Sequence, residues 1–286
     1  MRVALVCMVK KENQYLREFI EYYKNLGVTN VILYDNNDID GELIYPVIND
    51  YILSGFVKVY NIRGVRFNML QVCVNNEAYK NYYNYYDWFV FIDCDEYLIL
   101  NKHNNISDYL SQEKFNKYNK IILYWKIYGD NNMIYNNGMR LIDRFVNESE
   151  MPDVKTFHGR FGKNIVRGGL QELTNNNLFT QDTHNIISIS NTCDCNGNKF
   201  VLRYPDADPI FGDAHINHYM TKTISEFMNQ KYLGTDATYG FTRCNFGYFF
   251  SINEITKEKI DYIKSKGIDI NENIINILVQ NLFNRN

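Results

Sequence analysis

Short apolar runs alternate with amphipathic segments along residues 1–100. The run Val3–Val9 is continuously apolar, as a strand covered on both faces should be. Residues 12–26 then change to helical spacing, and Gly27 is a typical helix stop. Further strands are predicted over residues 30–34, 56–60 and 88–92, with a helix near residues 69–85. This β-α-β-β-α-β order predicts an α/β fold with a mostly parallel sheet and helices on both faces.

The remainder of the chain has a less regular pattern. Residues 120–128 form another apolar run, whereas residues 136–200 are rich in Asn, Gly and Thr and predict loops with short strands. A helix is expected over residues 222–233. Residues 253–283 predict two final helices that separate at Gly267.

Composition and charge narrow the classes of protein. The chain has 30 Lys+Arg and 33 Asp+Glu, so its net charge of −3 excludes nucleic-acid binding through bulk positive charge, and we expect no nucleic-acid partner. No stretch approaches the roughly 18 apolar residues that span a bilayer. The first apolar run is short and ends in lysines, unlike a signal peptide. Six scattered cysteines suit reduced thiols, so we expect a cytoplasmic protein.

Polar clusters follow three of the predicted strands. They are Lys10-Lys11-Glu12, Asp35-Asn36-Asn37 and Asp93-Cys94-Asp95-Glu96. Ligands of parallel α/β sheets bind outside the carboxyl ends of the strands. The coincidence of these clusters with strand ends therefore predicts a site at that edge of the sheet.

Asp93 and Asp95 carry the most specific chemistry. Residues two apart in an extended chain point to the same side, so both carboxylates can face one cation. Oxygen ligands suit Mg²⁺ or Mn²⁺, and such an ion can neutralise a nucleoside diphosphate leaving group. The alternative interpretation is a solvated loop that caps the next element.

His218 and Lys222 precede the helix expected over residues 222–233, where Thr223 and Glu226 form a capping-box pattern. His218 can be a further metal ligand or a donor to phosphate. Lys222 lies near the helix N-terminus, which favours anions. The alternative for His218 is a structural histidine.

Other candidates have weaker support. Asp35 and Asn36 suit a base or ribose, Arg66 a phosphate, and Trp125 a sugar ring, while Gln71 opens the helix before the fourth strand. The structural interpretations are a turn for Asp35 and Asn36, a solvated side chain for Arg66 and a core residue for Trp125. A modest basic patch, either solvated or facing an anionic acceptor, consists of His158, Arg160, Lys163 and Arg167.

Four segments together resemble glycosyltransferases of family 2-like and family 92-like type, which have the Rossmann-like GT-A fold. The segments are MVKKENQYLREFIEYYKNLGVTNVILYDNNDID, DWFVFIDCDEYL, WKIYGDNN and INHYMTKTISEFMNQKYLG. Gln71 also matches a Gln that the family has before a helix. The order and spacing agree over roughly residues 1–235, which makes the resemblance far more specific than two aspartates alone.

The resemblance implies a metal-dependent transferase that uses a nucleotide sugar. Residues 1–100 would be its nucleotide-binding half, residues 101–235 its acceptor-side half, and residues 236–286 a C-terminal helical extension. Asp93, Asp95 and His218 would hold Mn²⁺ or Mg²⁺ on the diphosphate. The nucleotide sugar would contact Val9, Lys10, Glu12, Asp35, Asn36, Arg66, Gln71, Asp93, Cys94, Trp125 and Lys222.

Family 92-like members invert the anomeric centre and known ones use UDP-galactose. We therefore expect transfer of a hexose, galactose, to a glycan or lipid-linked glycan in surface polysaccharide synthesis. Inversion needs a general base, for which Asp213, Asp130 and Glu172 are the candidates. Asp130 replaces a serine that is usual in the family's third segment, and Lys11 replaces the usual Asn of the first.

Three alternatives stay open from the sequence. One is a binding module that has lost its chemistry, and another is a nucleotidyltransferase, although the Lys10–Asn13 stretch lacks the expected glycines. The third is membrane contact at the inner face through the C-terminal helices, against a helix that packs on its own core or on a second subunit. The apolar stripe concerned is Ile274, Ile275, Leu278, Leu282 and Phe283.

Overall fold

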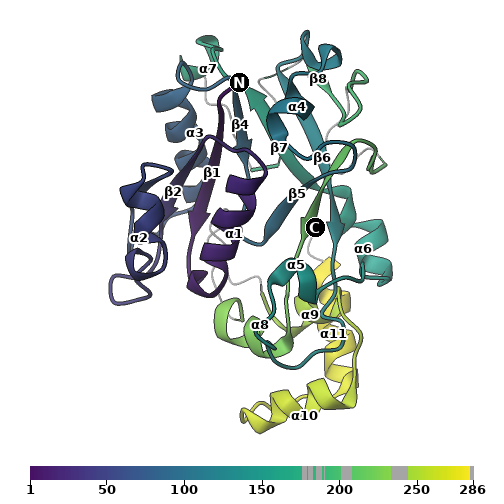
Figure 1. Cartoon of the computed structure of the whole chain (residues 1–286). Helices are drawn as coiled ribbons and strands as arrows, with labels where there is room; N and C mark the ends of the chain where they lie inside the picture. Colours follow the sequence, from purple (N-terminus) through teal and green to yellow (C-terminus); the bar gives the residue numbers. More distant parts are fainter. Residues whose placement is uncertain are drawn as a thin grey trace.

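The computed structural model describes residues 1–175, 179, 183–184, 189, 191–200, 208–232 and 244–283 (Figure 1). In this part of the chain, nine strands form a sheet with the order β3-β2-β1-β4-β7-β6-β9-β5, and β8 pairs with β6. The strands are β1 (Val3–Val9), β2 (Asn30–Asp35), β3 (Val57–Asn61), β4 (Trp88–Phe91), β5 (Glu96–Leu100), β6 (Lys120–Ile127), β7 (Gly162–Arg167), β8 (Thr192–Cys193) and β9 (Ala214–His218).

Most pairs of neighbouring strands are parallel. β3, β2, β1 and β4 run in one direction, and β6 is parallel to both β8 and β9. β7 is antiparallel to β4 and β6, and the edge strand β5 is antiparallel to β9. The α/β class and the mostly parallel sheet are therefore confirmed.

Helices cover both faces of this sheet (Figure 1). Alternate residues of β1 point to opposite faces, so Val3 and Leu5 pack with α1, whereas Ala4 and Val6 pack with α3. The helices are α1 (Asn13–Asn25), α2 (Tyr45–Leu53), α3 (Leu70–Tyr82), α4 (Ile106–Leu110), α5 (Leu141–Arg144), α6 (Pro152–Thr156), α7 (Glu172–Asn175), α8 (Ile224–Gln230), α9 (Phe246–Phe250), α10 (Lys257–Ser265) and α11 (Glu272–Phe283). Two short 3₁₀ helices lie at Glu113–Phe115 and His158–Arg160.

The structure corrects the expected order of elements. α2 lies between β2 and β3, where the sequence pattern predicted no helix. Only two residues of α2, Ile48 and Tyr51, are buried, and Leu53 is 79% exposed, so the helix has no regular apolar spacing. β5 was also missed, since it begins with Glu96 inside a polar cluster. The region expected to hold only loops and short strands contributes β7, a six-residue strand between β4 and β6.

The edge strand β5 is protected by tyrosines of α1. The Tyr22 hydroxyl donates to the Leu98 carbonyl at 2.8 Å. The Tyr23 hydroxyl donates to the Glu96 carbonyl at 3.0 Å and accepts from the Leu98 amide at 2.9 Å. Side chains thus replace a further strand along this edge, which keeps β5 from pairing with another chain.

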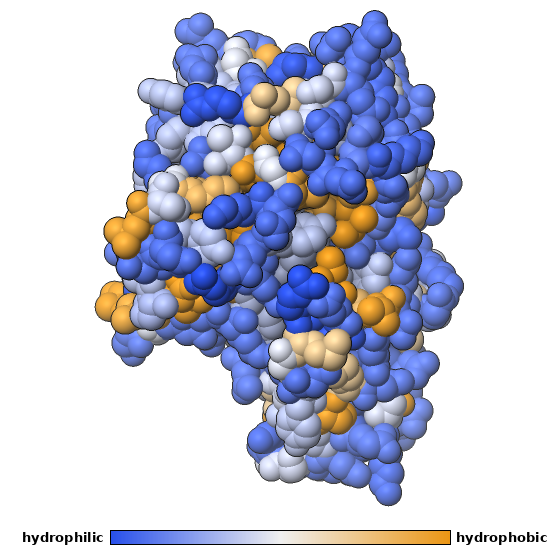
Figure 2. Space-filling model, viewed as in Figure 1, coloured by the Kyte–Doolittle hydropathy of each residue, from blue (hydrophilic) through white to orange (hydrophobic). Residues whose placement is uncertain are grey.

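The C-terminal helices pack against the main domain at the end of the sheet where β1 and β4 finish (Figure 1). In α11, Ile275 is fully buried, while Leu278 and Leu282 pack partly buried against the core. The Phe283 side chain lies outside the described residues. The stripe therefore packs largely on the protein's own core, although Ile274 is 39% exposed. Within the described part of the chain, no helix is long and apolar enough to cross a membrane. The face drawn in Figure 2 is mostly hydrophilic, with hydrophobic residues in small separate groups.

A buried ion pair joins α10 to the loop after β6. The Lys259 ammonium lies 2.8 Å from Asp130 Oδ2, and both side chains are almost inaccessible to solvent. The same ammonium donates to Asn132 Oδ1 and to the Glu254 carbonyl, both at 2.9 Å. Removing one partner of such a pair leaves an uncompensated buried charge.

Lys259→Met should therefore lower the free energy of unfolding by about 3 kcal/mol. Denaturant unfolding of the full chain measures this loss. The double variant Lys259→Met/Asp130→Asn removes both charges and should recover part of it. A single variant as stable as the wild type would contradict a structural role for the pair.

Candidate active site

A tight turn between β4 and β5 presents the two aspartates. The Asp93 amide donates to Glu96 Oε2 at 2.8 Å, and the Glu96 amide donates to the Asp93 carbonyl at 3.1 Å. Glu96 begins β5, where it pairs with His218 at the end of β9. His218 also pairs with Ile127 at the end of β6. The strand pairing therefore brings the turn and His218 to the same edge of the sheet.

Asp95 lies between a histidine and a lysine. Its Oδ1 is 3.5 Å from His218 Nε2, and its Oδ2 is 2.5 Å from the Lys231 ammonium at the end of α8. Burial disfavours the charge on Asp95, but Lys231 and His218 outweigh it and hold the pKa of this carboxyl well below its usual value. Asp95 is therefore a carboxylate at neutral pH.

Asp93 is more exposed and has different partners. Gln71 at the start of α3 donates to its Oδ1 at 2.5 Å, and the Lys163 ammonium on β7 lies 2.7 Å from its Oδ2. Burial opposes the charge here too, but Lys163 more than compensates, so the pKa of Asp93 is lowered. Both aspartates of the motif are thus charged and each has a lysine partner.

His218 is buried against Trp125 and Glu96. Its ring centroid is 4.4 Å from that of Trp125, and its Nδ1 lies 3.7 Å from Glu96 Oε1. Neither that nitrogen nor that oxygen has a hydrogen-bond partner among the described residues. Burial lowers the pKa of His218 and raises the pKa of Glu96 well above its usual value. A neutral imidazole keeps a lone pair on one ring nitrogen, and in the tautomer protonated at Nδ1, toward Glu96, the lone pair of Nε2 would face a cation beside Asp95.

These residues fit a divalent ion that shares its coordination with a phosphate. In the described part of the chain, no group of three or more Asp, Glu, His or Cys side chains is arranged so that it could hold a metal ion by itself. Mg²⁺ and similar ions commonly use one or two protein ligands and complete their coordination with water and substrate phosphates. Asp95 and His218 would supply two ligands of this kind, and Glu96 behind Nδ1 would orient the imidazole.

The loops after β1, β2 and β3 bring several predicted nucleotide-binding residues together. Lys10 and Arg66 both pair with Asp38, at 2.9 and 2.6 Å. Asn36 donates its side-chain amide to the carbonyls of Ile62 and Val65, and its backbone amide to the Val9 carbonyl. Asn36 therefore fixes the three loops to one another.

Asp35 and Glu12 each pair with a cationic side chain of the protein itself. Asp35 is buried and lies 3.2 Å from the Arg63 guanidinium. Glu12 pairs with the buried Lys222 ammonium at 3.2 Å, and that ammonium lies 4.3 Å from the centre of the Tyr15 ring. Cys94 is buried within the turn, where burial raises the pKa of its thiol well above the usual value.

The three candidate bases occupy different places. Asp213 precedes β9 and pairs with Lys102 and Lys114, so the length of β9 separates it from His218 by roughly 16 Å. Glu172 opens α7 after β7, at the edge of the sheet opposite the turn. Only Asp130 of the three follows a strand end on the edge of Asp95, and Lys259 pairs with it there.

Sequence reasoning missed Lys231 and the role of Lys163. Lys231 belongs to the quoted segment INHYMTKTISEFMNQKYLG, but its partner Asp95 is distant in sequence. The sequence places Lys163 in a basic patch that is either solvated or faces an anionic acceptor, whereas its side chain is only 3% exposed. An isolated lysine within the apolar-flanked stretch FGKNIV was the available signal.

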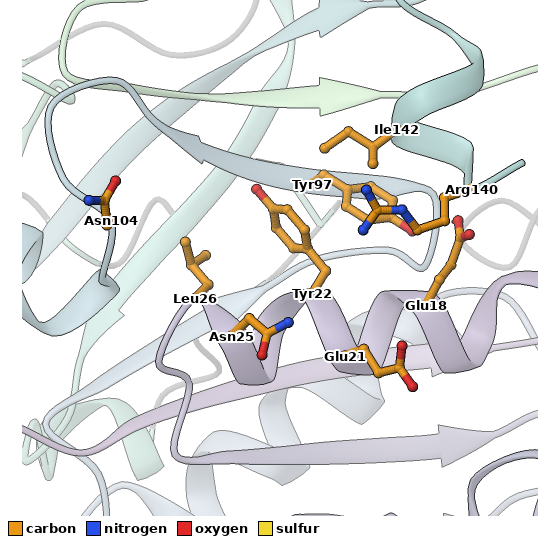
Figure 3. A pocket seen from close by; sticks show the side chains of 9 residues that line it. All are labelled: Glu18, Glu21, Tyr22, Asn25, Leu26, Tyr97, Asn104, Arg140 and Ile142. Atoms are coloured by element: carbon orange, nitrogen blue, oxygen red, sulfur yellow. The ribbon is translucent and has the colours of Figure 1, made fainter.

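A separate pocket lies on the other side of β5, between α1 and the approach to α5 (Figure 3). Glu18, Tyr22, Tyr97 and Arg140 line it. The Tyr97 hydroxyl donates to Glu18 Oε1 at 3.1 Å, and the Leu141 amide donates to the same oxygen at 2.9 Å. None of the two aspartates, His218 or Lys231 lines this pocket.

Comparison with known proteins identifies the family. A model of glycosyltransferase family 92 matches residues 3–223, which is most of the chain. The chain belongs to glycosyltransferase family 92. It is therefore a glycosyltransferase, and the matched range contains the turn with both aspartates and His218. No protein of curated function matches the sequence.

Solved structures show more distant similarity. The complex of S. aureus TarS residues 1–349 with UDP-GlcNAc has a TM-score of 0.46 and 12% identity over 100% of this chain and 72% of that one. The corresponding UDP complex has a TM-score of 0.37 and 13% identity over 63% of this chain and 50% of that one. The mannosyltransferase PcManGT from Pyrobaculum calidifontis, with GDP-Man and Mn²⁺, has a TM-score of 0.31 and 10% identity over 43% and 35% of the two chains. In the last two, the matched region spans half or less of the known structure.

The position of Asp213 leads to a direct test. Asp213→Asn should leave the rate of sugar transfer or donor hydrolysis within about threefold of the wild type, because the residue lies at the far end of β9. Loss of a general base costs about 10²- to 10⁴-fold. A loss of that size, measured as release of free nucleotide, would contradict the separation of Asp213 from the reaction.

Proposed function

We propose that this family 92 glycosyltransferase transfers a hexose from a UDP-linked donor to a glycan acceptor and depends on Mn²⁺ or Mg²⁺. The observation that carries the proposal is the placement of Asp95 Oδ1 3.5 Å from His218 Nε2, at the carboxyl edge of the parallel strands. UDP-galactose is the donor that the family resemblance favours. The acceptor would be a glycan or lipid-linked glycan of a surface polysaccharide, reached from the cytoplasm.

Asp95 and His218 would hold the ion, which supplies positive charge to the diphosphate as it leaves the sugar. Asp93 would take part through its more open carboxylate, oriented by Gln71 and Lys163. The loops joined by Asn36 would enclose the nucleoside. Lys10 and Arg66, which now share Asp38, would supply positive charge beside it.

Inversion at the anomeric carbon requires a base that takes the proton of the acceptor hydroxyl as the new bond forms and the bond to the diphosphate breaks. Asp130 is the candidate that lies at the same edge of the sheet as Asp95 and His218. Burial raises the pKa of Asp130 despite its pairing with Lys259, and a raised pKa makes a carboxylate a stronger base. Its role as the base is a proposal that depends on the acceptor reaching it.

One observation favours a second candidate function, a nucleotide-sugar-binding module without transfer. Both aspartates already have lysine partners, as in a site that balances its charge without a metal. Donor turnover distinguishes the two functions, because a binding module would shift its melting temperature with UDP compounds and release no sugar. Membership of a glycosyltransferase family gives no support to the nucleotidyltransferase alternative.

The proposal predicts a metal-dependent stabilisation by nucleotide. UDP with Mn²⁺ should raise the melting temperature, since a ligand present at 100 times its Kd adds about 2.7 kcal/mol to the stability of the folded state. Asp95→Asn should abolish the part of this shift that needs Mn²⁺. Asp213→Asn is the matched control, because it removes a carboxylate outside the site and should keep the full shift.

Donor turnover provides the second measurement. Asp95→Asn should lower transfer or hydrolysis of UDP-galactose by at least about 10²-fold, the size of effect expected for lost electrostatic stabilisation of a leaving group. Wild-type turnover that is the same with chelator as with Mn²⁺ would contradict the metal dependence. Turnover of another UDP-hexose in place of UDP-galactose would change the donor and keep the mechanism.

A further inference from the structure

We propose that Lys231 is an exchangeable internal cation, which occupies Asp95 before the metal binds and transfers to the donor's diphosphate afterwards, so that metal and nucleotide bind cooperatively. This inference rests on the proposed function. It assigns a binding role to a residue at the end of α8 that the sequence motifs alone did not select.

The contacts of Lys231 place its ammonium within the metal-binding pair. Nζ lies 2.5 Å from Asp95 Oδ2 and 2.6 Å from the Met220 carbonyl. The other oxygen of the same carboxylate faces His218 Nε2. A divalent ion between Asp95 and His218 would therefore share one carboxylate with the Lys231 ammonium. The ion and the ammonium are both positively charged, so they would repel each other.

Lys231 is free to change partner in a way that Lys163 is not. The Lys231 side chain is 24% exposed and leaves the C-cap position of a helix, so its four-carbon stem can swing. Lys163 is 3% exposed on β7, a strand between two others, and its ammonium lies between Asp93 at 2.7 Å and Glu96 at 3.8 Å. The structure thus combines one fixed and one movable counter-ion.

Charge balance explains why the exchange would couple the two ligands. Asp93 and Asp95 are offset by the ammonium groups of Lys163 and Lys231, which lie 2.7 and 2.5 Å from them. A divalent ion alone adds two positive charges to this balanced cluster. A diphosphate brings negative charge that both the ion and the displaced ammonium can contact. Each ligand therefore lowers the cost of binding the other.

The test measures Mn²⁺ binding to the full chain by electron paramagnetic resonance, with and without saturating UDP. In the wild type, UDP should raise the affinity for Mn²⁺ by about tenfold or more, within the usual range of coupling between sites. In Lys231→Met, Mn²⁺ alone should bind about threefold tighter or better, because the competing ammonium is gone. UDP should then raise the Mn²⁺ affinity by a clearly smaller factor than in the wild type, because only the direct contact between the ion and the diphosphate remains.

Two matched variants control for loss of charge and loss of fold. Lys264→Met removes an exposed lysine from the last turn of α10 and should keep wild-type coupling. Lys231→Gln keeps a polar group that can donate to the Met220 carbonyl, and it carries the test if the Met variant does not fold. It should show the same reduction in coupling.

The outcomes separate this inference from the proposed function. Wild-type coupling retained in a folded Lys231 variant would overturn the role of Lys231 while leaving metal-dependent donor binding intact. A wild-type protein that binds neither Mn²⁺ nor UDP would overturn the proposed function, and the inference with it. Coupling reduced in Lys264→Met as much as in Lys231→Met would also overturn the inference, because a lysine outside the site would then have the same effect.

Discussion

The pairing of Glu96 with His218 across β5 and β9 is the contact on which the candidate site depends. β4 ends in the parallel half of the sheet, and β9 lies beyond β7 and β6 in the strand order. The turn at residues 93–96 takes the chain from β4 to the edge strand β5 beside β9. That crossing places Asp95 against His218, and it also accounts for the burial of Glu96 beneath them.

Burying this group of charges imposes further requirements. A buried carboxylate is tolerated only with a compensating partner, and Lys163 and Lys231 supply one each to Asp93 and Asp95. The helix that ends beside Lys231 is itself anchored from two sides, because Glu226 of α8 accepts from Tyr15 of α1 and pairs with Arg144 of α5 at 2.8 Å. The first turn of α8 is therefore held in place, whereas Lys231 lies at its C-terminal end.

Much of the first half of the fold could be predicted because local patterns determine it. β1 matches its continuous apolar run, and the buried stripe of α1 follows the helical spacing of the sequence. The capping box of Thr223 and Glu226 was likewise a local signal. β5 could not be predicted in this way, because its edge is covered by hydroxyls of Tyr22 and Tyr23 from a distant helix. α2 lacks a regular apolar face, so its pattern resembles a loop.

The candidate site was likewise predictable only where local sequence patterns determine it. The aspartates follow a strand that the sequence predicts, whereas His218 ends β9, a strand that the sequence pattern did not predict, and the structure brings them to one edge. Asp213 is only five positions from His218 in sequence, but the extended strand between them separates the two residues by the full length of β9. The partners of Asp93 and Asp95 come from β7 and α8, and no local pattern indicates which lysine will meet which carboxylate. Charge balance is a property of the folded cluster, so the means by which this site could couple metal to nucleotide becomes visible only once its lysines are placed.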